Sequence, residues 1–460
     1  MIESRRFFLG CVLVWILPAC LVGAADPPNV VLILSDDQAW NDYSFMGHPT
    51  IKTPNIDRLA AEASTFRRGY VPTALCRPSL ASILTGHYPS THGIIGNDPS
   101  KSLVDASHTY EDRRAELIGR IDRFKTLPEA LGDAGYLTLQ TGKHWEGSYK
   151  RVGFDQGMTR GFPERGGRHG DDGLVIGRQG LQVISDFMDD AKKKNQPFFV
   201  YYAPFLPHAP HTPPKRLLDK YSALGLSEPV ARYQAMCEWF DETIGDLMKL
   251  VDDRGLREET LTVYVCDNGW IQSEKRNRFA PGSKQSANEA GVRTPIFYHW
   301  PGTISPVDHP ALATSLDIPL TIAAAAGIKE FGKGETLPDV PGRNLLNALQ
   351  SDEPVSNAML EREFIWGEGF SHDVADFENH DVSLLYRWIN DGTYKLLVNH
   401  DGTFAKYSEV HGERHTPFEL YDLTKDPNET QDLSEQMPGV VKKLLTELDV
   451  VRPSRTPLVN

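Results

Sequence analysis

The stretch "NVVLILSDD", residues 29–37, decides the fold class. Five consecutive apolar residues, Val30 to Leu34, leave this segment no polar face to turn toward water. A strand of that kind belongs in the middle of a parallel sheet, where helices cover both faces. The stretch therefore predicts an α/β fold, with Asp36 and Asp37 just beyond the end of a central strand.

Similar runs recur along the chain. Strand-like segments are "YLTLQTG" (136–142), "PFFVYYA" (197–203) and "LTVYVCDNG" (261–269). Helical patterns between them cover residues 53–63, 127–134, 179–194 and 229–252. This alternation indicates a large, mainly parallel sheet that is sandwiched by helices.

The pattern breaks near "LQSDEPVSN", residues 349–357. Beyond it, the short strands "YKLLVNH" and "FELYDL" and the amphipathic helix 439–450 predict a smaller α+β domain. A chain of 460 residues also exceeds the size at which one core is usual. We expect an N-terminal α/β domain over 26–350 and a C-terminal α+β domain over 351–460.

Residues 1–25 are typical of a secretory signal peptide. Arg5 and Arg6 precede a short apolar run, and small residues follow it. "SRRFFLG" is also typical of a twin-arginine signal, whereas "LPAC" fits a lipoprotein cleavage site less well because of Pro18. The apolar run is short for a membrane anchor, and no later stretch is long enough to span. The sequence predicts an exported protein, periplasmic or secreted.

Net charge limits the possible binding partners, and the number of cysteines limits the possible disulfides. A net charge of −14 with no basic run argues against nucleic acid, so an anionic ligand would need locally concentrated cations. Beyond the signal the chain keeps Cys76, Cys237 and Cys266. Three cysteines cannot all pair, so they form no disulfide framework.

Acidic residues follow two of the predicted strands. Asp36 and Asp37 come after one strand, and Asp267 and Asn268 come after another. Since the carboxyl ends of parallel strands form the binding crevice, these side chains should meet there. Close carboxylates repel one another unless a cation lies between them, and all-oxygen ligands favour Ca²⁺ or Mg²⁺. The pairs predict a cation site, although acidic residues after a strand also often only cap the loop.

Cys76 stands in "TALCRPSLASILTG", residues 73–86. Pro78 and Gly86 delimit a predicted helix over 78–85, with Cys76 at its N-terminus. Free amides and the helix dipole there favour anions, which predicts an acidified and exposed thiol. The alternative is that Cys76 is a small buried hydrophobic residue.

Six segments, in order, resemble the type I, formylglycine-dependent sulfatases of the alkaline-phosphatase-like superfamily. They are "NVVLILSDDQ", "TPNIDRLAAEASTFRRGYVPTALCRPSLASILTG", "TGKHWEG", "LPHAPHTPP", "VYVCDNG" and "GSKQSANEAGVRTP", and "FELYDLTKDPNETQDLSE" resembles the family's C-terminal domain. The resemblance implies that a formylglycine-generating enzyme oxidises Cys76 to formylglycine, whose hydrate is the nucleophile. It also implies one Ca²⁺ per chain, held by Asp36, Asp37, Asp267 and Asn268 and in contact with residue 76.

The same resemblance implies a set of cationic groups for the sulfate. Lys143 matches the lysine of the family's Gly-Lys-Trp-His motif, His208 the histidine of Pro-His-x-Pro, and Lys284 the sulfate-binding lysine. His211 in the doubled "PHAPH" competes with His208, but His208 keeps the prolines in register. His208 or Lys284 could protonate the leaving alcohol.

The chain departs from the family pattern at two positions. Leu80 replaces the arginine of Cys-x-Pro-Ser-Arg, and Arg77, three residues earlier, is the candidate substitute. In "GKHWEG" the histidine, His144, comes one position earlier than in the family motif. The resemblance implies that this histidine is the base that deprotonates the second hydroxyl of the formylglycine hydrate.

The sequence thus predicts an exported, calcium-dependent sulfuric ester hydrolase that acts on a sulfated carbohydrate. One alternative is a phosphodiesterase or phosphonate monoester hydrolase on the same fold, because such a site also accepts tetrahedral phosphoryl groups. Another is a sulfoglycan-binding protein without catalysis, in which Cys76 is never converted. We expect no nucleic acid partner and no transmembrane span.

Overall fold

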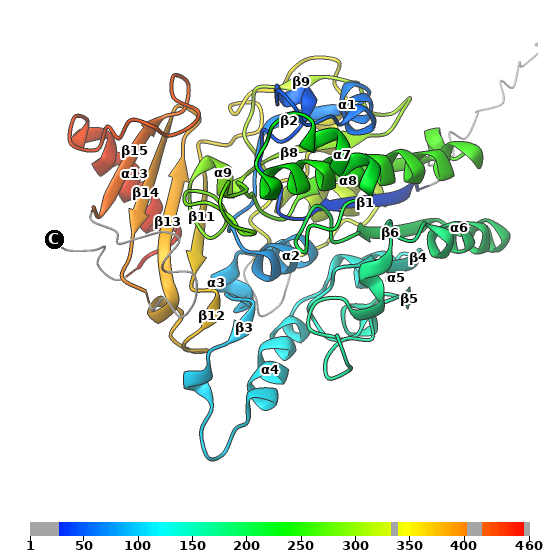
Figure 1. Cartoon of the computed structure of the whole chain (residues 1–460), viewed down its shortest axis with the longest axis horizontal. Helices are drawn as coiled ribbons and strands as arrows, with labels where there is room; N and C mark the ends of the chain where they lie inside the picture. The colour runs from blue at the N-terminus through cyan, green and yellow to red at the C-terminus, as the bar shows by residue number, and fades with distance from the viewer. Residues whose placement is uncertain (1–26, 333–338, 403–415, 455–460) are drawn as a thin grey trace, which may run out of the picture.

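A computed structural model describes residues 27–332, 339–402 and 416–454. The predicted export signal, residues 1–25, lies outside this part of the chain. The described chain places a large sheet with helices on both faces beside a smaller C-terminal sheet (Figure 1). No helix within these ranges has the length and apolar character needed to cross a membrane.

The central strand of the large sheet is β1 (Asn29–Ser35). It pairs in parallel with β7 (Thr260–Cys266) on one side and β6 (Phe198–Ala203) on the other. The strand order is β10-β2-β8-β7-β1-β6-β4-β5, and β9 also pairs with β2. The outer strands are β2 (Ser64–Tyr70), β4 (Leu137–Gly142), β5 (Gln156–Gly157), β8 (Arg293–His299), β9 (Asp308–His309) and β10 (Ala313–Thr314). Only β8 runs antiparallel to its neighbours, so the predicted mainly parallel sheet is confirmed.

Both faces of β1 are buried, because alternate side chains point to opposite faces of a strand. Val30, Leu32 and Leu34 join one core, and Val31 and Ile33 join another. Helices α2 (Cys76–Thr85), α5 (Leu127–Asp133) and α10 (Asp317–Ala325) cover the first face. Helices α1 (Pro54–Ala61), α6 (Gln182–Lys194) and α8 (Glu228–Asp253) cover the second (Figure 1).

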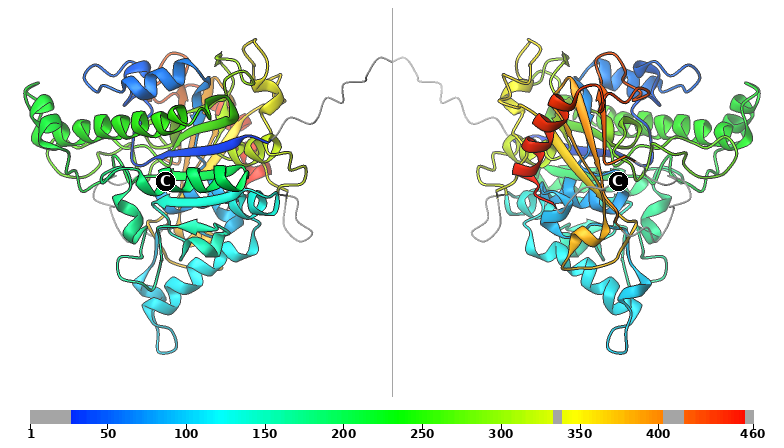
Figure 2. Two further views of the ribbon diagram at one scale, coloured as in Figure 1. Left: turned by 90° about the vertical axis from the view of Figure 1, so that its right-hand side faces the viewer. Right: turned by 90° about the vertical axis from the view of Figure 1, so that its left-hand side faces the viewer.

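The C-terminal sheet is antiparallel, in the order β11-β13-β14-β15. These strands are Ile365–Phe370, Leu384–Asn390, Tyr394–Asn399 and Phe418–Asp422, and α13 (Pro438–Val451) lies against them (Figure 2, right). Ile389 and Leu396 pack against Leu444 of α13. On the opposite face, Trp388 and Leu397 join the core of the large sheet. The smaller sheet is therefore docked firmly on the larger one.

A short pair of strands links the N-terminal and C-terminal parts of the chain, close to the candidate active site described below. β12 (Asp373–Val374) pairs in parallel with β3 (Asp98–Pro99). The pairing brings His372 beside Asn97, and the side-chain nitrogen of Asn97 lies 3.3 Å from Nε2 of His372. The remaining helices of the described residues are α3 (Pro89–His92), α4 (Tyr110–Gly119), α7 (Lys215–Ser222), α9 (Glu289–Val292) and α11 (Leu346–Leu349). Short 3₁₀ turns cover 44–46, 101–103, 120–123, 149–152, 171–175, 257–259 and 380–383.

Candidate active site

The acidic residues after β1 and β7 lie side by side at one edge of the sheet. The register pairs Ser35 with Cys266, so the two strands end together. The Asp37 amide donates to Asp267 Oδ1 at 3.2 Å, and Asn268 Nδ2 donates to Asp37 Oδ1 at 2.7 Å. Asp37 has a φ of 62°, a left-handed conformation that turns the chain sharply after the strand.

Cys76 is the first residue of α2, at the buried end of the site. Its sulfur lies 4.0 Å from Asp36 Oδ1 and 3.9 Å from Asp37 Oδ1. The residue is only 1% exposed, and burial raises the pKa of the thiol to about 12, against the opposite effect of Lys143 and Lys284. The prediction of an exposed, acidified thiol is therefore wrong. The helix N-terminus points its first residue into the protein, toward carboxylates, instead of toward solvent.

Two lysines neutralise the acidic residues. Lys143 Nζ lies 2.7 Å from Asp36 Oδ1 and 3.2 Å from Asp267 Oδ2. Lys284 Nζ lies 2.6 Å from Asp37 Oδ1. Burial alone would lower the pKa of both lysines, but the adjacent carboxylates raise each pKa above its ordinary value. Both side chains therefore remain charged at neutral pH.

The acidic residues still carry oxygens that no group of the described chain satisfies. Asp36 Oδ2, Asp37 Oδ2 and Asn268 Oδ1 are buried and make no hydrogen bond there. Burial and the Asp36 carboxylate raise the pKa of Asp267 to about 7. Buried oxygens without partners are rare unless a ligand meets them. This donor set of carboxylate and amide oxygens fits a hard cation such as Ca²⁺.

The two histidines of "PHAPH" differ in position. His208 Nδ1 donates to the Ala209 carbonyl at 2.6 Å, and its Nε2 lies 3.4 Å from Asp37 Oδ2. His211 instead packs between the rings of Tyr233 and Trp270. The structure thus brings His208, the histidine preferred from the sequence, to the acidic residues and to Cys76.

A cavity of about 420 Å³ opens from Cys76. Its other lining residues are Asn97, Asp98, Trp145, Arg168, His169, His208, Ala209, Trp270, Asn277, Arg278, Phe279, Lys284 and His372. Arg168, Arg278 and Lys284 gather here although the whole chain carries a charge of −14. This local concentration of cations is what an anionic substrate requires.

Sequence reasoning singled out none of Asp98, Arg168 and His169, which belong to the far wall of this cavity. Asp98 is ion-paired with Arg114 at 3.0 Å and with Arg168, and these arginines lower its pKa to about 2 in spite of burial. His169 follows Arg168 directly, and His372 arrives from the C-terminal part. These loops contain no periodic pattern, and only Arg168 and His169 are marked in the sequence, by the charged string "RHGDD" at 168–172.

The residues at the two departures from the family pattern lie outside the cavity lining. Arg77 is completely buried and makes a two-pronged ion pair with Glu146, at 2.8 and 2.7 Å. Leu80 packs in the core beneath α2. His144 is also buried, and its backbone amide donates to the His169 carbonyl at 3.2 Å. Thus His144 is near the site but does not line the cavity of Cys76.

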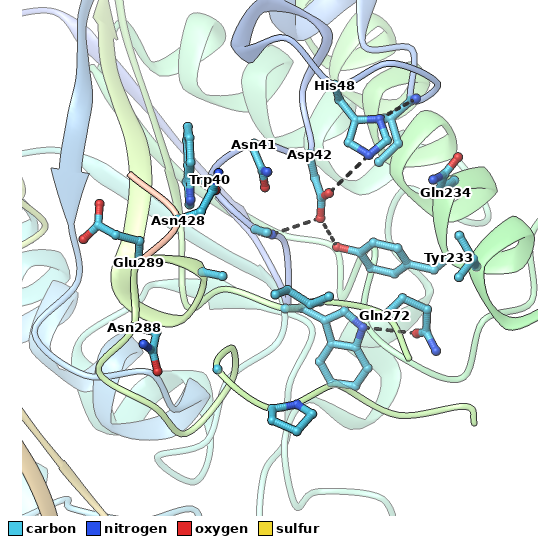
Figure 3. Close-up of a pocket in the computed structure, with 18 of the residues that line it drawn as sticks. Trp40, Asn41, Asp42, His48, Tyr233, Gln234, Gln272, Asn288, Glu289 and Asn428 are labelled. Atoms are coloured by element: carbon cyan, nitrogen blue, oxygen red, sulfur yellow. Dashed lines mark hydrogen bonds and ion pairs between the residues drawn. The ribbon is translucent and has the colours of Figure 1, made fainter. Parts of the chain in front are cut away.

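A second cavity, of about 540 Å³, lies on the other side of Trp270. Figure 3 shows its polar lining, in which Asp42 accepts a hydrogen bond from Tyr233 at 2.6 Å and faces His48. Glu289 adds further negative charge, and no lysine or arginine of the described chain lines this cavity. It would repel an anion, so the cavity of Cys76 is the candidate active site.

Fold and site together define a hydrolase of the alkaline-phosphatase-like superfamily. The sulfatase family profile matches residues 28–328, well over half of the chain, and the chain therefore belongs to the sulfatase family. Arylsulfatase A of Homo sapiens is 31% identical over 478 aligned residues, which cover 93% of this chain and 87% of the relative. Human N-acetylgalactosamine-6-sulfatase is 28% identical and covers 90% of this chain and 82% of the relative. These relatives are sulfuric ester hydrolases, as is this enzyme.

Solved structures share the fold at low sequence identity. A sulfatase from Pseudoalteromonas superposes with a TM-score of 0.65 at 20% identity, covering 94% of this chain and 92% of the other. A phosphonate monoester hydrolase from Agrobacterium radiobacter superposes with a TM-score of 0.63 at 17% identity, covering 94% and 96%. At this identity the likeness extends to the fold alone, so the chemistry has to be argued from the site.

Proposed function

We propose that this sulfatase hydrolyses a sulfate ester of a sulfated carbohydrate, with Cys76 converted to formylglycine and with one bound Ca²⁺. The observation that carries the proposal is the position of Cys76. Its sulfur lies 3.0 Å from Lys284 Nζ and within 4.0 Å of Asp36 and Asp37, at the buried end of a cavity lined with cations. An unmodified thiol with a pKa near 12 would be a poor nucleophile in that position.

The acidic residues support calcium. Asp36, Asp37 and Asn268 would hold the ion through the oxygens that make no hydrogen bond in the described chain, and Asp267 would add a buried carboxylate beside them. Bound there, Ca²⁺ would supply positive charge to sulfate oxygens and to residue 76. The two lysines would then be released from the carboxylates in part and could turn toward substrate oxygens.

The cationic side chains have roles that follow from their positions. We assign Lys143 and Lys284 to the negative charge that develops on the sulfate oxygens, since both stay charged. His208 lies beside Asp36, Asp37 and Cys76 and also lines the cavity. Either His208 or Lys284 delivers the proton to the leaving alcohol. Arg77 is assigned a positioning role, because Glu146 already neutralises it below the site.

Conversion of Cys76 would supply a hydrated aldehyde, with two hydroxyl groups on one carbon. That pair suits ester cleavage, since one oxygen can attack sulfur and loss of the other's proton can release sulfate afterwards. A serine or cysteine offers only one such group. We therefore infer that a formylglycine-generating enzyme is a partner during maturation.

The cavity wall supports a sugar as the leaving group. Trp145 and Trp270 offer aromatic faces, and Asn97 and Asp98 offer polar groups beside them. Sugar rings pack on aromatic faces while their hydroxyls bond to amides and carboxylates. The name of the human N-acetylgalactosamine-6-sulfatase points the same way. We also propose export to the periplasm or the exterior through residues 1–25.

The test is to produce the chain with a formylglycine-generating enzyme and to measure the mass of the peptide that contains residue 76. We expect an aldehyde there and hydrolysis of an aryl sulfate and of sulfated oligosaccharides. Cys76→Ser, with a single hydroxyl, should be inactive. A fully active protein whose residue 76 remains a thiol would overturn this mechanism.

Two alternatives are tested in the same experiment. The shared fold of the phosphonate monoester hydrolase makes phosphate diesters and phosphonate monoesters the competing substrates. A higher kcat/KM for them than for sulfate esters would reverse the assignment. Leu80, in place of the signature arginine, favours the second alternative, a sulfoglycan-binding protein. An unconverted, inactive chain would support it, provided that a Cys-x-Pro-Ser-Arg control is converted in the same host.

A further inference from the structure

We propose that His169, and not His144, takes the proton from the second hydroxyl of residue 76 when sulfate is released. The inference rests on the proposed function, because it needs the hydrated aldehyde. It adds a catalytic residue that the sequence motifs do not mark.

His169 belongs to the cavity of the reaction. It lines the same 420 Å³ cavity as Cys76, His208 and Lys284, whereas His144 does not line it. The two histidines are neighbours through their backbones, since the His144 amide donates to the His169 carbonyl.

The His169 ring is held in place by aromatic packing. Its centroid lies 5.3 Å from that of Trp145, edge to face, and 5.1 Å from that of Phe205. Nδ1 of the ring is buried and has no hydrogen-bond partner among the described residues. A buried ring nitrogen without a partner is uncommon, and a ligand in the cavity would supply the missing partner.

The charge around His169 favours the neutral ring. Burial, followed by Lys143 and Arg168, lowers its pKa to about 3. At neutral pH the ring therefore carries one proton and one lone pair, as a proton acceptor must. A sulfated residue 76 would bring negative charge into the cavity and raise the proton affinity of the ring during release.

The local sequence explains why His144 is excluded. In "GKHWEG" the side chain that reaches the cavity wall is Trp145, and His144 turns into the protein near Arg77. His144 is only 2% exposed. Because His144 does not line the cavity, another side chain has to accept the proton of the second hydroxyl. We assign this role to the His169 ring, which lies in the loop after β5.

The proposed step balances. The free hydroxyl of sulfated residue 76 gives its proton to the His169 ring. The electron pair of the O–H bond forms the C=O bond of the aldehyde, and the C–O bond to the sulfo group breaks. Sulfate leaves with the electron pair of the broken C–O bond, His169 loses its proton to solvent, and water adds to the aldehyde again. No oxidant or reductant is needed.

The experiment compares His169→Ala and His169→Asn with His144→Asn, all verified to carry the aldehyde. Each is mixed with excess aryl sulfate, and phenol release and intact mass are recorded. We expect the His169 variants to release a burst of about one phenol per active site and then to slow by ~10²-fold or more. Their mass should rise by one sulfo group. His144→Asn should turn over without accumulating that species.

Several outcomes would overturn the assignment. In the first, His144→Asn gives the burst and accumulates the sulfated protein. In the second, both His169 variants turn over at a nearly normal rate. In the third, the His169 variants turn over slowly but accumulate no sulfated species. A thermal unfolding curve for each variant identifies a folding defect, and His169→Asn keeps a larger, polar side chain should alanine disturb the packing. Failure of the proposed function would look different, since wild-type protein with a verified aldehyde would then release no phenol.

Discussion

The ammonium group of Lys284 lies 3.0 Å from the sulfur of Cys76. No short-range pattern joins these residues, which are separated by 208 positions. The contact places a permanent positive charge beside the side chain that we propose to be converted to formylglycine. A charge there can stabilise an oxyanion on residue 76 or on the substrate, but it would be of no use to a buried structural cysteine.

We predict that Lys284→Ala and Lys143→Ala each lower kcat/KM for an aryl sulfate by ~10²-fold or more, because they remove charge that meets the transition state. His208→Ala should lose a similar factor. His211→Ala should be milder, since its ring packs between Tyr233 and Trp270. Steady-state kinetics check this. An inactive His211→Ala beside a nearly normal His208→Ala would reverse our choice of histidine.

Calcium removal should abolish turnover, and added calcium should restore it. Asp267→Ala should lose bound calcium and activity together, because its carboxylate is part of the buried oxygen set. Asp219→Ala is the matched control, since Asp219 lies on the surface of α7 and pairs with Lys215. Metal content and kcat are measured on the same samples. Full activity in a verified metal-free preparation would refute the site.

Acid should destabilise the protein partly through His309, far from the active site. Its Nδ1 accepts from the Val355 amide at 3.0 Å, and its Nε2 lies 2.5 Å from Ser64 Oγ. Burial lowers its pKa to about 4. Since the folded pKa is below that of the unfolded chain, this contribution is complete above pH ~6.5 and is lost as the pH falls toward 4.

His309→Gln should therefore be less stable than wild type at pH 7, and the difference in Tm should shrink toward pH 4. Thermal unfolding of the variant and of wild type between pH 4 and 7 measures this difference. A constant difference for His309→Gln would show that the ring does not titrate in this way.

The core of the fold follows from local sequence, but much of the site does not. Val30 to Leu34 show by themselves that β1 is buried on both faces, and Asp36 and Asp267 follow from the ends of strands. Whether Cys76 faces solvent or protein depends on what lies across from the helix N-terminus, which no local pattern records. His372 reaches Asn97 through the pairing of β12 with β3, a contact across 275 residues. His169 lies in a loop whose path is set by tertiary contacts.

Leu80→Arg should destabilise the protein, although it restores the family signature. Leu80 is 5% exposed and packs in the core of the large sheet. An arginine there would bury a charge without a partner. The stability lost should be about 3–5 kcal/mol, as when one member of a buried ion pair is removed and the other is left unpaired. Leu80→Met should lose less than about 1.5 kcal/mol. Denaturant unfolding of both variants checks this, and an arginine variant as stable as wild type would mean that the core opens to accept the charge.

The buried pair of Arg77 and Glu146 gives the last prediction. Their side chains are 0% and 3% exposed, and the guanidinium also donates to the Asn97 carbonyl at 3.2 Å. Removing one member leaves a buried charge, so Arg77→Met and Glu146→Leu should each lose about 3–5 kcal/mol of stability. The double variant replaces both charges with apolar groups and should recover most of it. If Arg77 acts only by positioning the first turn of α2, the double variant should also keep kcat/KM within about tenfold of wild type. A double variant that folds normally but has lost ~10²-fold or more in kcat/KM would show instead that the Arg77 charge acts on residue 76 or the substrate, as the missing signature arginine would.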